Sequence, residues 1–398
     1  MTHEDVQETE MLVAVEAVPT WLAQTEVWLH DQLRHLPPSV DVHVICETVA
    51  HLEQFPIAHL HALAAEPMWR VVMDKGLRKL GLRRQLGFVA HELRRLRPAV
   101  LHSHYGPVGW RNARLAQRAG ARHVVTFYGY DVNQLPSTNP RWRSRYAELF
   151  QLADVVLCEG PHMRECIMRL GCPDEKVRVH RLGIALEELA FRPRRWMPGE
   201  PLRVLLAGSF REKKGLPYAL DALGQFQCEV PVEVTLIGDA TDAPRDQAEK
   251  QRILEAITRS GLKDRVRRLG YQPHATLLEE AYRHHVFLSP SIVAADGDTE
   301  GGAPVTIIEM AATGMPVVST THCDIPQIIR DGETGYLAAE RDVAGLVASL
   351  RKLTDEPESW TPLVKRARTH IEAGFSAVRQ GRELARLYDE LAAIQPAI

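Results

Sequence analysis

The stretch EGGAPVTIIEMAATGMPVVST, residues 300–320, places a glycine-rich turn before a helix and an apolar run after it. Pro304 suits the first position of a helix, because the N–H that proline lacks would be unpaired there. Three apolar residues then share one face of the expected helix: Val305, Ile308 and Ala312. The run at 316–321 is typical of a strand buried on both faces of a parallel sheet. The stretch therefore predicts a helix that leads into a buried strand.

Short apolar runs of the same kind recur along the chain and alternate with helix-length segments. They lie at 11–18, 41–46, 99–106, 123–129, 154–160 and 177–183, and again at 202–210, 232–239, 266–271, 285–291, 316–321 and 334–339. This alternation predicts an α/β protein with two Rossmann-like, doubly wound parallel-sheet domains that face a central cleft. The expected parts are an N-terminal acceptor-binding domain (1–190), a proline-containing basic linker (191–201), a C-terminal donor-binding domain (202–375) and a C-terminal helix (376–398) that packs back on the N-terminal domain.

The composition excludes several classes of protein. The 398 residues are 45% hydrophobic and 25% charged, with a formal net charge of -3, which argues against a nucleic-acid partner. The six cysteines show no C-x-x-C spacing, so a zinc site is not expected. The acidic start does not resemble a secretory signal, and no apolar run approaches the roughly 20 residues that span a bilayer. These features indicate a cytoplasmic protein.

The turn at 301–303 has the chemistry of a phosphate site. It lacks bulky side chains, so a ligand can approach the backbone closely, and the helix that follows offers free N–H groups and a positive dipole end. Glu309 lies about 7–8 Å along that helix, and Glu300 lies before the turn. A nucleotide sugar fits this layout, with ribose near Glu309, hexose near Glu300 and the diphosphate between them. The alternative is that both glutamates are solvated surface residues.

These motifs, with IPQIIRDGETGYL at 325–337, resemble the retaining glycosyltransferases of family four (glycosyl transferases group 1), including the exopolysaccharide and colanic-acid type. The resemblance implies a GT-B fold. It also implies that the first glutamate meets the donor sugar and the second meets the donor ribose. The family has seven residues between these glutamates, whereas eight separate Glu300 from Glu309, so a slightly longer loop is expected to deliver Glu300.

A second donor element is LLAGSFREKKGLPYALDAL, residues 205–223. It resembles the family pattern G-R-x-x-x-x-K-G, in which the cations hold the diphosphate. Lys214 matches, but Ser209 stands at the arginine position, and Arg211 is expected to replace it; a solvated basic turn is the alternative. The resemblance assigns the donor site to Gly208, Ser209, Arg211, Lys214, Gly238, Tyr271, Glu300, Gly301, Gly302, Ala303, Pro304, Val305 and Glu309.

In the N-terminal, acceptor-binding half, two expected strands end in the segments LHSHYGPVGW (101–110) and TFYGYDVN (126–133). His102 and His104 are expected on one face of a strand, but no third metal ligand is evident, so no metal is predicted. The family often has a histidine near the donor sugar where Tyr128 stands, and His104 is a candidate to stand in for it. Asp131 either binds a sugar hydroxyl or caps a turn. The catalytic candidates are His104, Tyr128, Asp131 and Glu300.

The segment 75–98 carries eight cations and one acidic residue, Glu92, among leucines and a phenylalanine. Such a segment suits either a peripheral contact with an anionic membrane, on its cytoplasmic face, or a solvated basic surface.

The prediction is a glycosyltransferase that moves a hexose from a UDP or GDP sugar to a sugar, a lipid-linked or a small-molecule acceptor. The family resemblance implies retention through front-face attack, without metal or another cofactor. Two alternatives remain: a nucleotide-sugar epimerase of GT-B fold, and a non-catalytic subunit that binds nucleotide sugars.

Overall fold

The computed structural model describes residues 11–23 and 26–394. Its N-terminal domain is built on a seven-stranded parallel sheet in the order β3-β2-β1-β4-β5-β6-β7. The strands are β1 (Leu12–Trp21), β2 (Val40–Val49), β3 (Leu60–Ala62), β4 (Val100–His104), β5 (Arg122–Thr126), β6 (Val155–Cys158) and β7 (Val177–Val179). All six strands predicted here are confirmed, and β3 was missed because three residues show no periodicity.

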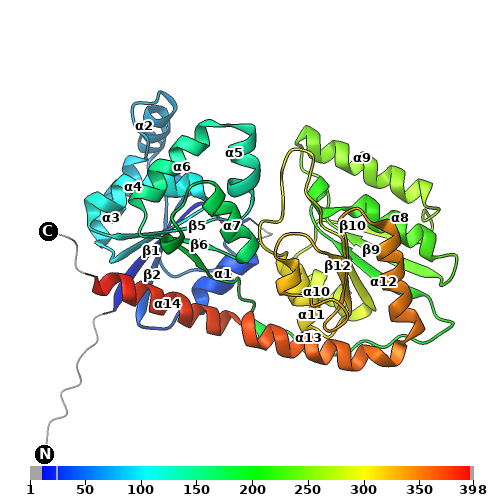
Figure 1. Ribbon diagram of the computed structural model, residues 1–398. Coiled ribbons are helices and arrows are strands. Elements are labelled where there is room, and N and C mark those ends of the chain that lie inside the picture. The colour runs from blue at the N-terminus through cyan, green and yellow to red at the C-terminus, as the bar shows by residue number, and fades with distance from the viewer. Residues whose placement is uncertain (1–10, 24–25, 395–398) are drawn as a thin grey trace, which may run out of the picture.

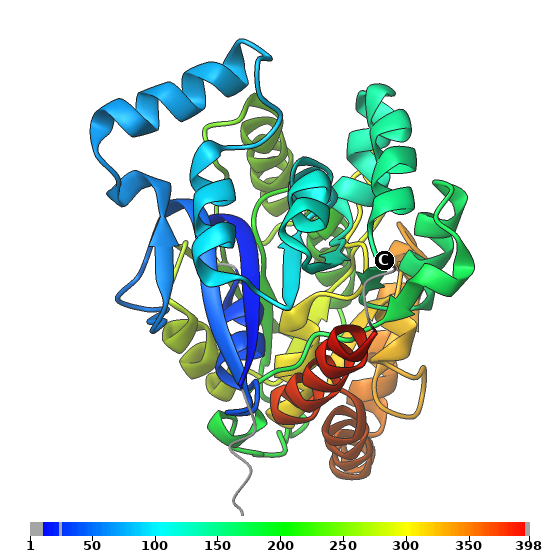
Figure 2. The same cartoon turned by 90° about the vertical axis from the view of Figure 1, so that its left-hand side faces the viewer.

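Helices cover both faces of this sheet (Figure 1). They are α1 (Val27–Arg34), α2 (Met68–Lys79), α3 (Gly87–Leu96), α4 (Gly106–Ala119), α5 (Leu135–Thr138), α6 (Arg141–Leu152) and α7 (Pro161–Arg169). The strands bury nearly continuous apolar runs, as both faces of a parallel sheet require. In two views α2 projects from the body of the domain (Figures 1 and 2).

The C-terminal domain has a six-stranded parallel sheet in the order β10-β9-β8-β11-β12-β13. Its strands are β8 (Leu202–Ala207), β9 (Val232–Ile237), β10 (Val266–Gly270), β11 (Val286–Ser289), β12 (Val317–Thr320) and β13 (Tyr336–Ala338), each predicted from its apolar run. Its helices are α8 (Leu216–Phe226), α9 (Pro244–Arg259), α10 (His274–Arg283), α11 (Val305–Ala312), α12 (Val343–Asp355) and α13 (Trp360–Gly374). α11 begins one residue after Pro304, and it is buried almost all round rather than along one stripe.

The last helix, α14 (Ala377–Ala393), returns to the N-terminal domain (Figure 1). Its buried face, which includes Leu384 and Tyr388, packs with β1, β4 and β5 in one hydrophobic cluster. Residues 395–398 of the expected C-terminal helix lie outside the described residues. The segment 191–201 forms no helix or strand, yet Trp196 is buried in the C-terminal core, so the segment is anchored to that domain.

The carboxyl ends of the two sheets face each other. Asn133, after β5, donates to Thr299, after β11, at 2.7 Å. The backbone N–H of His162, after β6, donates to Asp324, after β12, at 2.8 Å. Ligands bind beyond the carboxyl ends of such sheets, so the interface between the domains is the expected site. Among the described residues, no helix combines the length and apolar character needed to span a bilayer.

Candidate active site

A cavity of about 140 Å³ lies between the domains. Six predicted donor-site residues line it: Gly208, Ser209, Gly238, Tyr271, Val305 and Glu309. Val27 and Trp28 of α1 close the cavity from the N-terminal domain. The two chain segments that carry the predicted donor motifs therefore converge on one space, and α1 of the opposite domain contributes a wall.

Glu309 lies on α11 and is buried, with only 4% of its surface exposed. Its Oε1 lies 2.7 Å from Nε2 of His274, the first residue of α10. Burial lowers the pKa of His274, but the hydrogen bond and the charge of Glu309 outweigh burial and raise that pKa above 6.5. The cavity thus presents an acid paired with an imidazole. His274 was missed, because no local pattern links it to a residue 35 positions away.

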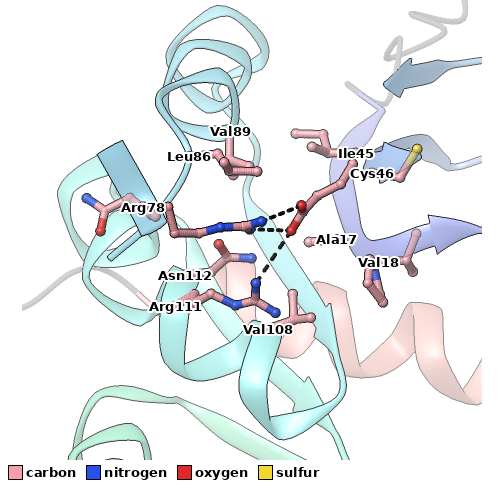
Figure 3. A pocket seen from close by; sticks show the side chains of 13 residues that line it. Ala17, Val18, Ile45, Cys46, Arg78, Leu86, Val89, Val108, Arg111 and Asn112 are labelled. Atoms are coloured by element: carbon pink, nitrogen blue, oxygen red, sulfur yellow. Dashed lines mark hydrogen bonds and ion pairs between the residues drawn. The ribbon is translucent and has the colours of Figure 1, made fainter. Parts of the chain in front are cut away.

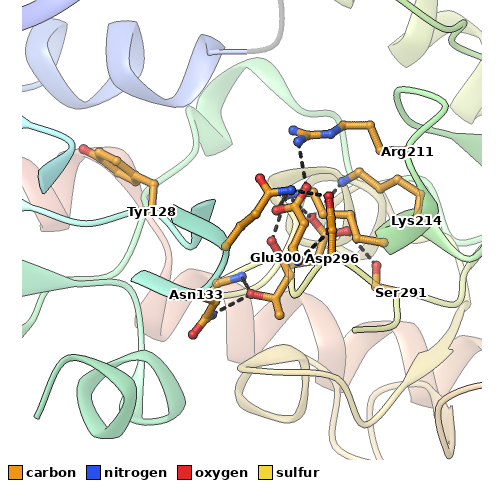
Figure 4. A network of polar contacts seen from close by, with 12 residues as sticks. Tyr128, Asn133, Arg211, Lys214, Ser291, Asp296 and Glu300 are labelled. Carbon is orange, nitrogen blue, oxygen red and sulfur yellow. Dashed lines mark hydrogen bonds and ion pairs between the residues drawn. The ribbon is translucent and has the colours of Figure 1, made fainter. Parts of the chain in front are cut away.

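Glu300 is held in a network of polar contacts (Figure 4). Its Oε2 accepts a hydrogen bond from Nζ of Lys214 at 3.0 Å, and its Oε1 accepts one from the Ser291 hydroxyl at 2.8 Å. Burial alone would raise the pKa of Glu300, but Lys214 and Lys213 lower it to about 2. Glu300 is therefore a carboxylate at neutral pH, and it lies in contact with Lys214, the lysine of the second predicted donor element.

The turn after Glu300 touches the N-terminal domain. Gly301 has a φ of +80°, and a Cβ added there would lie 2.5 Å from Cα of Gly129. A Cβ added at Gly302 would lie 2.1 Å from Oε2 of Glu159, another acid that the sequence did not single out. Burial, followed by the nearby carboxylates of Asp324 and Asp131, raises the pKa of Glu159 well above its usual range. The glycines thus allow backbone to meet backbone across the cleft. Ala303 and Pro304 complete the turn and lead into α11.

Arg211 lies elsewhere than predicted. Its guanidinium forms an ion pair with Asp298, at 2.7 Å, and lines a separate cavity with Arg245 and Asp246. It does not line the cavity that contains Glu309, whereas Ser209 does. In this conformation, the arginine expected to replace the family arginine is instead neutralised by Asp298.

On the acceptor side, His104 and Tyr128 belong to a buried network. Nδ1 of His104 lies 2.5 Å from the Tyr128 hydroxyl, and Nε2 lies 2.8 Å from Oε2 of Glu16. The Tyr128 ring points away from the network around Glu300 (Figure 4) and packs on Trp28, with 4.5 Å between ring centroids. Tyr128 therefore supports, from behind, the wall that Trp28 contributes to the cavity between the domains.

The inference that no third metal-ligating residue lies near His102 and His104 was wrong. Glu16 comes within 3.2 Å of His102 and 2.8 Å of His104, because β1 pairs with β4 in a register that sets Glu16 opposite His102. The two histidines also contact Tyr388, Thr126 and Tyr128. Since each imidazole nitrogen has a hydrogen-bond partner, the network accounts for these side chains as a structural unit.

For Asp131, the structure shows the turn-capping role. Its Oδ2 accepts the backbone N–H of Gly106 at 2.7 Å, and its Oδ1 accepts that of Tyr128 at 2.9 Å. The side chain is fully buried, and burial raises its pKa to about 6. Asp131 thus fixes the loops after β4 and β5.

Comparison with known proteins relates this geometry to a family. Residues 25–188 match the description Glycosyltransferase Family 4, and residues 201–356 match Glycosyl transferases group 1. WcaL of Escherichia coli, named as a colanic acid biosynthesis glycosyltransferase, is 31% identical over 74% of this chain and 71% of its own length. The amylovoran biosynthesis glycosyltransferase AmsK of Erwinia amylovora is 32% identical over 68% of this chain and 64% of its own length.

Solved structures share the fold. HepE of Anabaena, in a complex with UDP and glucose, superposes with a TM-score of 0.74 at 16% identity and covers 95% of this chain and 100% of its own. Sucrose-phosphate synthase of Thermosynechococcus elongatus also has a TM-score of 0.74, at 19% identity, over 96% of this chain and 99% of its own. The chain has the GT-B fold, and it is a glycosyltransferase that belongs to the family-four, group 1 glycosyl transferases.

Proposed function

We propose that the protein transfers a hexose, with retention of configuration, from a UDP or GDP sugar to a carbohydrate or lipid-linked acceptor. The observation that carries this proposal is that Gly208, Ser209 and Glu309 line one cavity between the domains, while Lys214 passes beside Gly208 and pairs with Glu300. HepE, which has the same fold, was crystallised in a complex with UDP and glucose, and this supports a nucleotide-sugar donor.

Each side chain has a task in this proposal. Glu309, oriented by His274, accepts hydrogen bonds from the ribose hydroxyls. The backbone N–H groups at the start of α11 and the ammonium group of Lys214 hold the diphosphate and stabilise the charge that develops as it leaves. Glu300 is ionised, so it accepts hydrogen bonds from hexose hydroxyls rather than donating a proton.

The proposed reaction is a front-face displacement. The acceptor hydroxyl attacks on the side from which the nucleoside diphosphate departs, and a phosphate oxygen takes its proton. The protein then needs no carboxylate nucleophile, metal or other cofactor, and its contribution is to position both substrates. Contact between Gly129 and Gly301 closes the domains over the reacting groups and limits the access of water.

The acceptor is proposed to enter from the N-terminal domain, where the protein rests on the cytoplasmic face of a membrane. The predicted contact segment 75–98 covers the end of α2 and all of α3. Phe88, Val89 and Leu93 of α3 are core residues, so the exposed part of the amphipathic pattern lies on α2 and the loop after it.

The test is turnover and thermal stabilisation with a panel of nucleoside diphosphates and their sugars. A ligand that binds only the folded state raises the melting temperature. We expect Glu309→Ala to abolish the rise caused by the best nucleotide, while Glu279→Ala, an exposed acid on α10, leaves it intact. An unchanged rise in Glu309→Ala would show that Glu309 does not contact the ribose.

Turnover distinguishes the alternative functions. Binding without any release of nucleoside diphosphate would indicate a subunit that only binds nucleotide sugars. Conversion of the donor sugar without release would indicate an epimerase.

A further inference from the structure

A second cavity, of about 30 Å³, lies inside the N-terminal domain, between β1, β2 and α4 (Figure 3). Its inner wall is mostly apolar, with the amides of Gln85 and Asn112 among apolar residues that include Ala17, Val18, Ile45, Leu86, Val89 and Val108. Two arginines, Arg78 and Arg111, stand at its rim, with 26% and 28% of their side chains exposed. No donor-site residue lines this cavity, so it is separate from the nucleotide site.

The rim carries excess positive charge. Arg78 donates hydrogen bonds to Glu47 from both terminal nitrogens, at 2.5 and 2.7 Å. Nη1 of Arg111 lies 3.4 Å from the same carboxylate. Burial would raise the pKa of Glu47, but Arg78, Arg111 and the nearby Lys75 lower it, so Glu47 is ionised. Three cations therefore surround Glu47, and Asp74 is a second acid near Arg78. Nη2 of Arg111 makes no hydrogen bond to the part of the chain that the structure describes, and it is available to a ligand.

This cavity lies beside the switch point of the sheet, along β1 and β2 and just before their carboxyl ends. β1 has β2 on one side and β4 on the other, so the chain reverses its direction across the sheet at β1. In doubly wound sheets, the crevice beyond the carboxyl ends at such a switch point is the ligand site. The cavity lies against the later residues of β1 and β2 and against the first turns of α4, which follows β4.

The helix that supplies Arg78 has an outer face suited to a bilayer. Six large apolar side chains on α2 and the loop after it are exposed: Met68 at 74%, Trp69 at 67%, Val72 at 62%, Met73 at 44%, Leu80 at 74% and Leu82 at 69%. Exposed cations accompany them at Lys75, Lys79 and Arg83. An exposed apolar stripe with lysine and arginine beside it fits the surface of an anionic membrane.

We propose that Arg78 and Arg111 bind the phosphate or diphosphate group of a lipid-linked acceptor, while the outer face of α2 rests on the bilayer. The guanidinium fork matches phosphate oxygens in pairs, and the excess positive charge at the rim attracts a phosphate anion. Glu47 holds the arginines in place between turnovers. The inference rests on the proposed transferase function, because it names the chemical class of the acceptor.

The test uses farnesyl diphosphate as a short lipid diphosphate, with inorganic pyrophosphate and glucose 1-phosphate beside it, in titration calorimetry on the full chain. We expect Arg111→Gln to raise the Kd for farnesyl diphosphate about tenfold or more. Arg118→Gln, an exposed arginine on the same helix, should leave that Kd unchanged. Glu47→Gln should lower the Kd, because it removes the competing anion. An unchanged Kd in Arg111→Gln, or weaker binding in Glu47→Gln, overturns the site.

A separate experiment tests the proposed contact with the lipid bilayer. Trp69→Ser should reduce sedimentation with phosphatidylglycerol vesicles and leave the Kd for pyrophosphate unchanged. Vesicle binding that survives this change, or glucose 1-phosphate binding as tightly as farnesyl diphosphate, overturns the lipid assignment. A cooperative melting transition without ligand reports whether each variant folds, and thermal stabilisation by a nucleoside diphosphate reports donor binding. Glu309→Ala should abolish that stabilisation without affecting farnesyl diphosphate, so failure of the donor proposal and failure of this one are distinguishable.

Discussion

Nζ of Lys214 lies 3.0 Å from Oε2 of Glu300, a residue 86 positions later in the chain. The lysine comes from the loop after β8 and the glutamate from the loop after β11. Because β8 and β11 are neighbours in the sheet, their carboxyl ends place both loops together. The pair compensates the charge of a buried carboxylate and keeps the lysine beside Gly208, next to the cavity where the diphosphate is proposed to bind.

Lys214→Met should therefore destabilise the protein. It removes a charged hydrogen bond to a buried carboxylate, which is worth about 1.5–3 kcal/mol. Glu300 has a pKa lowered from 4.5 to about 2, so its contribution is present above pH 4.5 and is lost as the pH falls towards 2. Urea unfolding should show the difference between wild type and variant at pH 7, shrinking below pH 4.5. Lys250→Met, which breaks an exposed pair with Asp239, should cost less than about 1 kcal/mol. Equal losses in both variants would contradict this account.

The pair of His274 and Glu309 predicts the opposite pH dependence. The pKa of His274 is raised above 6.5, so the stability that it contributes is complete below pH 6.5 and is lost as the pH rises through the raised value. The side chain is about one-third exposed, so His274→Gln should cost only about 1 kcal/mol at pH 6 and less at pH 8.5. Denaturant unfolding at the two pH values checks this. His51→Gln, an exposed histidine near Glu53, is the control and should show no such trend.

Tyr388→Phe tests the buried network behind the cavity wall. The Tyr388 hydroxyl donates to Oε1 of Glu16 at 2.7 Å, and both side chains are fully buried. Loss of this donor leaves a buried carboxylate short of a partner, which costs about 1–3 kcal/mol. Tyr282→Phe removes a hydrogen bond at the surface, to the Ala190 carbonyl, and should cost about 0.5–1 kcal/mol. Thermal unfolding that ranks the two variants in the reverse order would show that the network does not need Tyr388.

Gly129→Ala tests the contact between the domains. Gly129 has a φ of +96°, and an added Cβ would lie 2.7 Å from Cα of Gly301. The substitution should hold the domains apart, increase the radius of gyration in small-angle scattering and lower turnover more than about tenfold. Gly120→Ala shares the positive φ, at +70°, but a Cβ there meets nothing within 4 Å. It should show only backbone strain, of about 1–3 kcal/mol, with turnover retained. Equal scattering profiles for the two variants would contradict the predicted separation.

Local patterns predicted much of this protein because they depend on few residues. Each apolar run of sufficient length became a strand, and the short edge strand Leu60–Ala62 escaped because three residues carry no pattern. The glycine turn and Glu309 were found through a motif of contiguous residues. Trp28 and His274 were missed, because neither belongs to that motif and both reach the cavity from other elements.

The sequence by itself determined the two α/β halves, the strand ends and the glycine-rich turn, because periodicity and turn chemistry are local properties of the chain. Only the tertiary structure decided which polar side chains meet: Glu16 with His104, Arg211 with Asp298, and Glu47 with two arginines. Such pairs depend on strand order and register between residues far apart in the chain. A charged side chain therefore meets its partner only when the sheets have formed and water has been excluded from the space between them.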